Sequence, residues 1–84
     1  MAPIYTNNVR LILNKYLLTQ MQLVIASGLS PGTVNKTCRR KIDPNQQSKN
    51  DIVNGINKLL VERSIAKVYT VHQVFSPSEF GKID

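Results

Sequence analysis

Basic residues gather in the first half of the chain, where they could bind a polyanion. Residues 1–42 contain no carboxylate side chain and six basic residues, which are Arg10, Lys15, Lys36, Arg39, Arg40 and Lys41. Residues 43–84 contain five basic and five acidic residues, so the net charge of +6 belongs entirely to the first half. This uneven distribution is typical of proteins that bind nucleic acid, although a solvated basic surface would look the same in the sequence.

Few residues in the sequence could support catalysis or bind a metal ion. The chain has one cysteine, Cys38, and one histidine, His72. These counts exclude an internal disulfide, a cysteine-based zinc cluster and a multi-histidine site. The carboxylates of Asp43, Asp51 and Glu62 have no partner histidine nearby in the sequence. We therefore expect no enzyme activity, metal or cofactor, with Cys38 a semi-buried packing residue and His72 on the surface.

Length and hydropathy indicate a single domain. A chain of 84 residues forms a modest core and offers little material for a deep catalytic cleft. The N-terminus lacks the basic stretch followed by an apolar stretch that marks a signal peptide, and the apolar runs are too short to cross a bilayer. We expect one soluble, intracellular domain over residues 1–84 with no membrane partner.

The first predicted helix covers roughly residues 7–17. Its apolar residues recur at the i, i+3, i+4 and i+7 spacing that places side chains on one helix face. These residues are Val9, Ile12, Leu13 and Tyr16. Either Thr6 or Asn7 can serve as the N-cap of this helix.

Capping residues predict two further helices separated by a tight turn. Thr19 and Gln22 form a capping box, in which each side chain accepts a hydrogen bond from the backbone of the other, so a second helix follows Thr19. This helix stops at Gly28, because glycine readily adopts the left-handed conformation that follows a helix end. Ser30 is the N-cap of the third helix, and Pro31 lies in its first turn, where proline is tolerated.

A loop over residues 40–47, with an Asp-Pro turn signal, separates the third helix from a longer fourth helix. Ser48 and Asp51 are a cap pair for this fourth helix, over Ser48–Val61. Its apolar face consists of Ile52, Ile56, Leu59 and Leu60, with Val53 beside it. Gly55 costs about 1 kcal/mol of helix propensity relative to alanine, which suggests that it permits close packing of another helix.

The stretch Ala66–Phe75 allows two interpretations. Its many β-branched and aromatic residues favour a strand. However, Thr70 and Gln73 make another capping box, and the apolar residues after Thr70 have helical spacing. These apolar residues are Val71, Val74 and Phe75. We favour a short fifth helix, followed by a tail over residues 76–84 whose Ser-Pro pair can start one more turn.

Seven residues of the second and third helices follow one ungapped pattern. They are Thr19, Gln20, Leu23, Gly28, Leu29, Ser30 and Val34. The pattern resembles the helix-turn-helix of the lambda-repressor-like (Cro/repressor, XRE) family, whose members commonly have these residue types at these positions. The loop with a proline, the long fourth helix and the short fifth helix ending in an aromatic residue also fit the family. The resemblance thus covers roughly residues 7–75.

The resemblance implies an all-α fold, a compact bundle of about five short helices with a central helix-turn-helix at about residues 19–37. Leu23, Leu29 and Val34 would fill the angle between its two helices, leaving the outer side of the third helix free to enter the major groove of DNA. The implied function is a sequence-specific transcriptional regulator of double-stranded DNA, in the cytoplasm and encoded by a bacterium or a phage. A homodimer is expected, because one small module reads few bases; the fifth helix and the tail, which contains Phe80, would form its interface.

The resemblance assigns DNA contacts to ten residues, which are Gln20, Ser30, Pro31, Gly32, Thr33, Asn35, Lys36, Arg39, Arg40 and Lys41. Gln20 would face a phosphate at the start of the second helix. Lys36 would donate to guanine, and Asn35 would pair with adenine if it turns inward. The basic run Arg39–Lys41 would hold phosphates and set the register on the duplex.

Three places depart from the family pattern. Val24 stands where alanine is usual, and Thr37-Cys38 stands where an apolar residue followed by glutamate is common. Pro31 and Gly32 occupy positions at which many members carry base-reading side chains. The expected contacts therefore shift toward the later part of the third helix and the basic run, which favours affinity and DNA shape over fine base selection.

Met21 and Ile25 leave an alternative function open. They lie one turn apart on the second helix, at positions that the family usually leaves polar. Either the N-terminal Ile4-Tyr5 segment covers them, or they form a contact surface. In the second case the protein would be a protein-interaction module, such as an adaptor or an inhibitor subunit, with a partner protein on this face.

Overall fold

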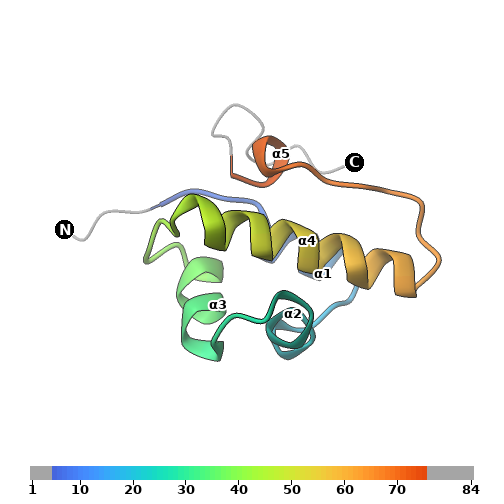
Figure 1. The fold of residues 1–84 in the computed structure, drawn as a ribbon, viewed down its shortest axis with the longest axis horizontal. Coiled ribbons are helices and arrows are strands. Elements are labelled where there is room, and N and C mark those ends of the chain that lie inside the picture. The colour runs from blue at the N-terminus through green and yellow to red at the C-terminus, as the bar shows by residue number, and fades with distance from the viewer. Residues whose placement is uncertain (1–4, 76–84) are drawn as a thin grey trace.

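The longest helix, α4, lies at the centre of the fold. The computed structural model describes residues 5–75, which contain five helices and no strand: α1 (Val9–Lys15), α2 (Gln20–Ser27), α3 (Pro31–Cys38), α4 (Gln46–Glu62) and α5 (Val71–Phe75). Figure 1 shows α5 on one side of α4 and the α2–α3 pair on the other. The expected all-α bundle of five short helices is confirmed.

The core forms where the other four helices meet the apolar face of α4. The α4 side chains in this core are those expected from the sequence, namely Ile52, Val53, Ile56, Leu59 and Leu60. Each of the other helices adds at least one fully buried side chain, and these include Ile12 from α1, Leu23 from α2, Val34 from α3 and Val74 from α5. Because each of these elements contributes to a single core, none of them is stable as a separate unit.

Gly55 is where α2 lies closest to α4. A Cβ atom placed on Gly55 would lie 3.0 Å from Leu23 Cδ1 and 3.0 Å from the backbone nitrogen of Ser27. At such a distance any larger residue would push the backbone of α2 away from α4. The expectation that this glycine permits close helix packing is confirmed.

The start of α1 differs from the sequence prediction. The helix begins at Val9 and ends at Lys15, rather than spanning residues 7–17, and its N-cap residue is Asn8, whose side chain makes no capping bond. The Asn8 amide is buried and donates to the carbonyl oxygen of Gln73 at 3.1 Å. Asn7 accepts a hydrogen bond from the Val9 N–H at 3.0 Å. The N-cap position is thus Asn8 and not the predicted Thr6 or Asn7, although the Asn7 side chain still accepts from the first N–H of the helix.

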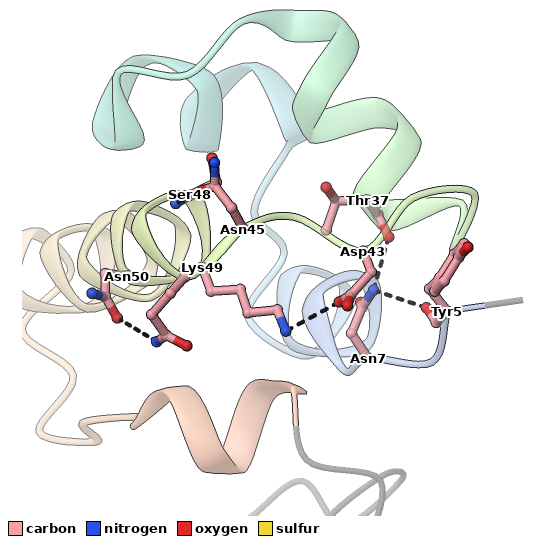
Figure 2. A network of polar contacts seen from close by, with 9 residues as sticks. Tyr5, Asn7, Thr37, Asp43, Asn45, Ser48, Lys49 and Asn50 are labelled. Carbon is pink, nitrogen blue, oxygen red and sulfur yellow. Dashed lines mark hydrogen bonds and ion pairs between the residues drawn. The ribbon is translucent and has the colours of Figure 1, made fainter.

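Asn7 and Asn8 tie the beginning of α1 to two distant parts of the chain. The Asn7 amide donates to the carbonyl oxygen of Thr37 on α3 at 2.9 Å, and Figure 2 shows it between Thr37 and Tyr5. The backbone N–H of Asn8 donates to the carbonyl oxygen of Val74 on α5 at 2.8 Å. Both asparagine side chains are buried, so each of these bonds satisfies a group that would otherwise be costly to bury.

The start of α4 also corrects the sequence prediction. The N-cap is Asn45, whose side-chain oxygen accepts from the Ser48 N–H at 2.8 Å, so the helix begins at Gln46 and Ser48 lies inside its first turn. Asn45 and Ser48 are both good N-cap residues, and the sequence favours neither on local grounds. Lys49, one residue further along α4, pairs with Asp43 of the preceding loop at 3.1 Å, as Figure 2 shows.

The segment before α5 contains no strand, which settles the ambiguity of Ala66–Phe75 in favour of a helix. Asn57 on α4 holds Tyr69 by two hydrogen bonds, accepting from its N–H at 2.8 Å and donating to its carbonyl oxygen at 2.9 Å. Thr70 and Gln73 form the expected reciprocal bonds at the start of α5. The turn predicted after Ser76 and the role given to Phe80 lie outside the described residues.

Substitution at Gly55 tests the close approach of α2 to α4. We expect Gly55→Ala to lower the free energy of unfolding by about 1–3 kcal/mol, because the added methyl group meets backbone atoms of Ser27 that cannot move independently. Urea denaturation followed by circular dichroism measures this change. Gly32→Ala is the matched control: a Cβ there meets nothing within 4 Å, so stability should be unchanged or rise by up to about 1 kcal/mol. A Gly55→Ala variant as stable as the parent would show that the contact is not required.

Candidate nucleic-acid interface

Local hydrogen bonds define where α2 and α3 begin. The hydroxyl of Thr19 accepts from the Gln22 N–H at 3.1 Å, while the Gln22 side chain accepts from the Thr19 N–H at 2.8 Å. Ser30 accepts from the Thr33 N–H at 3.2 Å and caps α3. Gly28 ends α2 in the left-handed conformation, with φ 76°. The predicted caps and the glycine turn are confirmed.

Apolar side chains fill the angle between α2 and α3. Leu23 and Val34 are fully buried, and Leu29 in the turn is partly buried against the same core. Val24 also packs partly buried against this core. The α2–turn–α3 unit is therefore anchored from within, which leaves its outer surface free for a ligand.

The helix α3 has one buried face and one exposed face. Val34, Thr37 and Cys38 are buried, and the Thr37 hydroxyl donates to the carbonyl oxygen of Thr33 at 2.8 Å, so it is satisfied within the helix. The exposed residues of α3 and its C-cap are Pro31, Gly32, Asn35, Lys36 and Arg39. The outer face of α3 thus presents polar and cationic side chains with no carboxylate among them.

A side-chain hydrogen bond connects the exposed surfaces of α2 and α3. The amide nitrogen of Asn35 donates to the side-chain oxygen of Gln20 at 3.1 Å. This bond orients the Gln20 amide group, whose own N–H donors make no other contact within the described residues and remain available to a phosphate oxygen. It also holds Asn35 at the side of α3 that faces α2.

The three residues of the basic run have different surroundings. Arg39 and Lys41 are exposed, whereas Arg40 is half-buried and its guanidinium donates to the carbonyl oxygen of Asn7 at 3.1 Å. Arg40 also has a left-handed backbone, with φ 60°, and its carbonyl oxygen accepts from the Tyr5 N–H at 3.0 Å. Arg40 therefore stabilises the junction between α3 and the residues before α1, a role that the sequence did not indicate.

The surroundings of α3 carry positive charge without a nearby compensating acid in the sequence. No acidic residue occurs before Asp43, and Asp43 is itself paired with Lys49 at 3.1 Å. Within residues 5–75 this is the single ion pair. The exposed Lys36, Arg39 and Lys41 consequently have their full charge available for a polyanion.

A shallow pocket of about 380 Å³ lies between α1 and the end of α3. Its lining consists of Arg10, Leu11 and Asn14 from α1 and of Cys38, Arg39 and Arg40. Arg10 was not singled out in the sequence as a contact residue, because it lies far along the chain from the other two arginines. The sequence contains one signal of this surface, since Arg10 and Asn14 are one turn apart on the same helix.

Cys38 is an interior packing residue. Burial raises the pKa of its thiol to about 11, and the positive charge of Arg10 opposes this rise. The protonated, buried thiol is a weak nucleophile. His72 is exposed, as expected, and residues 5–75 contain no cluster of three side chains suited to hold a metal ion.

Met21 and Ile25 are exposed over 58% and 75% of their surface. Tyr5, the first described residue, lies at the end of α3, where its N–H donates to Arg40. Tyr5 therefore does not cover these two side chains, and Ile4 lies outside the described residues. Of the two explanations considered for this apolar pair, covering by Tyr5 is wrong.

Comparison of the chain with protein-family models, with curated proteins and with solved structures finds no match in any of the three. The likeness to lambda-repressor-like proteins therefore stays a prediction from the residues. Among residues 5–75, no helix combines the length and the apolar composition needed to cross a bilayer. The function must be inferred from the geometry and the charge of the surface around α3.

The raised pKa of Cys38 makes stability depend on alkaline pH. In the unfolded chain the thiol ionises near its ordinary pKa of 9.0, whereas burial keeps it protonated in the folded state to about pH 11. The stability that the buried, protonated thiol contributes is complete below the thiol pKa of the unfolded chain. It is lost as the pH rises toward the thiol pKa of the folded protein. We expect the stability difference between the parent and Cys38→Ala to shrink by roughly 1–2 kcal/mol between pH 8 and pH 10.5.

Urea denaturation of both proteins at several pH values measures this difference. Effects of pH that do not involve Cys38 are common to both proteins and cancel in the comparison. A difference that stays constant up to pH 10.5 would show that the thiol ionises as easily in the folded protein as in the unfolded chain.

Proposed function

We propose that the protein is a transcriptional regulator that binds double-stranded DNA by inserting α3 into the major groove. The observation that carries the proposal is the two-sided character of α3: Val34, Thr37 and Cys38 anchor it, while Asn35, Lys36 and the C-cap Arg39 are exposed. A single α-helix fits the major groove, and such an anchored helix presents its outer side chains to base edges. The resemblance to the lambda-repressor-like helix-turn-helix supports the same function.

The contacts divide into base reading and phosphate binding. Lys36 donates to guanine, and Thr33 contacts a thymine methyl group. Gln20 and Ser30, at the starts of α2 and α3, bind phosphates, as do the exposed Arg39 and Lys41. At Pro31 and Gly32 the helix offers no base-reading side chain, and the open space around Gly32 permits the backbone to approach the duplex closely.

Specificity in this proposal depends on DNA shape and on dimerisation. With Asn35 bonded to Gln20, Lys36 is the main direct reader, so sequence-dependent groove shape supplies part of the selectivity. We propose a homodimer on a two-fold site, because doubling the module doubles the number of bases read. The regulator would act in the cytoplasm of a bacterium or of a phage-infected cell, without a cofactor and without enzymatic activity.

Two substitutions that each remove one positive charge test this proposal, one at a base-reading residue and one at a phosphate-binding residue. Lys36→Ala should relax the base preference at one position of the site, by about 1–3 kcal/mol of discrimination. Arg39→Ala should instead weaken binding to all sequences alike and reduce the salt slope of log K by about 1. Selection of bound sequences from a random duplex pool, followed by salt titrations, separates the two effects.

Lys15→Ala provides the matched control, because it removes the same charge from an exposed position at the end of α1. It should leave both the preference and the salt slope close to those of the parent. Arg40→Ala is a poor probe, since it also breaks the bond to Asn7. The proposal fails if the parent has no measurable affinity for random duplex DNA at low salt, or if all variants bind equally at every salt concentration.

A second candidate function is a protein-interaction module, and the exposure of Met21 and Ile25 favours it. Ile25 shares a shallow surface depression with Lys58 and Glu62, which lie one turn apart on α4. Within the described residues neither of these charged side chains has an ion-pair partner. An apolar centre flanked by one cation and one anion is complementary to itself across a two-fold axis, so the partner that this face fits is a second copy of the chain.

The oligomeric state of Ile25→Asp tests this candidate. A buried charge at the centre of such an interface is strongly unfavourable, so the variant should be monomeric by sedimentation equilibrium at concentrations at which the parent self-associates. Val68→Asp is the comparison, because Val68 is equally apolar and 63% exposed but precedes α5. Dissociation by Val68→Asp alone would place self-association on the α5 side instead, and a monomeric parent would remove this candidate.

A further inference from the structure

The pocket between α1 and the end of α3 brings together three arginine side chains from two separate segments. Arg10 comes from α1, and Arg39 and Arg40 follow α3, while Asn14 adds an amide from the next turn of α1. No carboxylate belongs to the lining. Three cationic residues that line one concave surface favour the binding of an anion there.

Arg10 and Arg39 are available to bind an anion, and Arg40 is fixed beside them. Arg10 and Arg39 are exposed and form no ion pair within the described residues. Arg40 is held in place by its bond to the Asn7 carbonyl oxygen at 3.1 Å, which orders one wall of the pocket. A guanidinium group offers five N–H donors in a planar fork that matches the oxygens of a phosphate group, and the Asn14 amide can add a further donor.

The buried residue in the pocket lining strengthens such an interaction. Cys38 belongs to the lining and is buried, so the pocket adjoins a region of low polarity, where charge–charge attraction is screened less than in bulk water. The positive charge of Arg10 acts on the Cys38 thiol and lowers its pKa against the larger effect of burial.

We propose that this pocket, formed by Arg10, Asn14, Arg39 and Arg40, is a binding site for a phosphate group. Its volume of about 380 Å³ falls within the range of small-ligand pockets and admits a phosphate with an attached group. The phosphate has two chemical sources, the backbone of a DNA duplex held by α3 or a free phosphorylated small molecule. The first source rests on the proposed function, whereas the second is independent of it.

Titration with free phosphate compounds tests the site without DNA. Inorganic phosphate and pyrophosphate are added to the protein, and the backbone amide signals near Arg10, Asn14 and Arg39 are followed by NMR. We expect saturable shifts in the parent, with binding at least about tenfold weaker in Arg10→Gln, since a charge-assisted phosphate contact is roughly twice as strong as a neutral hydrogen bond. Lys15→Gln is the matched control: it removes the same charge from the same helix outside the pocket and should bind like the parent.

Duplex DNA distinguishes the two sources. If the phosphate belongs to the DNA backbone, Arg10→Gln lowers the salt slope of log K by about 1, Lys15→Gln does not, and pyrophosphate competes with DNA. If it belongs to a small molecule, Arg10→Gln loses pyrophosphate binding and keeps the affinity of the parent for DNA. Either result supports the proposed phosphate site in this pocket.

The proposal is overturned if Arg10→Gln and the parent behave alike in both titrations. Arg39→Gln is tested in parallel, so that a folding defect of one variant does not hide the answer, and circular dichroism checks the fold of each. A parent that binds pyrophosphate but no duplex DNA would contradict the proposed regulator while leaving the phosphate site intact.

Discussion

The contact between α2 and α4 at Gly55 is the constraint on which the rest of the structure depends. With no side chain at this position, the backbone of α2 at Ser27 approaches α4 closely, and Leu23 packs onto it fully buried. Burying a leucine side chain contributes about 1.5–3 kcal/mol, but its larger effect is geometric. Because Leu23 and Val34 meet in the same core, the position of α2 on α4 also sets the position of α3, and hence which of its side chains face outward.

Polar bonds over long sequence distances supply the second constraint. Asn7 reaches the carbonyl oxygen of Thr37, Arg40 reaches the carbonyl oxygen of Asn7, and Asn8 reaches that of Gln73. The first two bonds hold the start of α1 against the end of α3, and the third holds it against α5. The arginine-lined pocket is a consequence of this arrangement, because it brings Arg10 beside the basic run.

Acidic residues are confined to the second half of the chain, outside α1, α2 and α3. The half of the chain that forms α1, α2 and α3 contains no acidic residue, while the carboxylates of the second half lie on α4, in the loop before it and in the tail. The first of them, Asp43, is neutralised by Lys49. Both the proposed DNA-binding surface and the proposed phosphate site therefore lie in a region where nothing nearby in the sequence opposes the approach of an anion.

Features with a local physical cause could be predicted from the sequence alone. The capping boxes of Thr19 with Gln22 and of Thr70 with Gln73 each involve residues three apart, and the left-handed turn at Gly28 requires only the glycine itself. The core face of α4 follows from its 3.6-residue period. The helical fold, the boundaries of α2 and α3 and the outward face of α3 could thus be predicted without coordinates.

Tertiary structure decided the features in which local signals compete or do not exist. Asn45 and Ser48 are equally suitable caps, and Asn8 gives up its capping role for a bond to Gln73, 65 residues away. The anchoring of Arg40 and the pocket beside Arg10 arise from contacts across some thirty residues of chain. Such contacts leave no periodicity or spacing to be read, because only the packing of α2 on α4 and of α1 against α3 brings these groups within bonding distance.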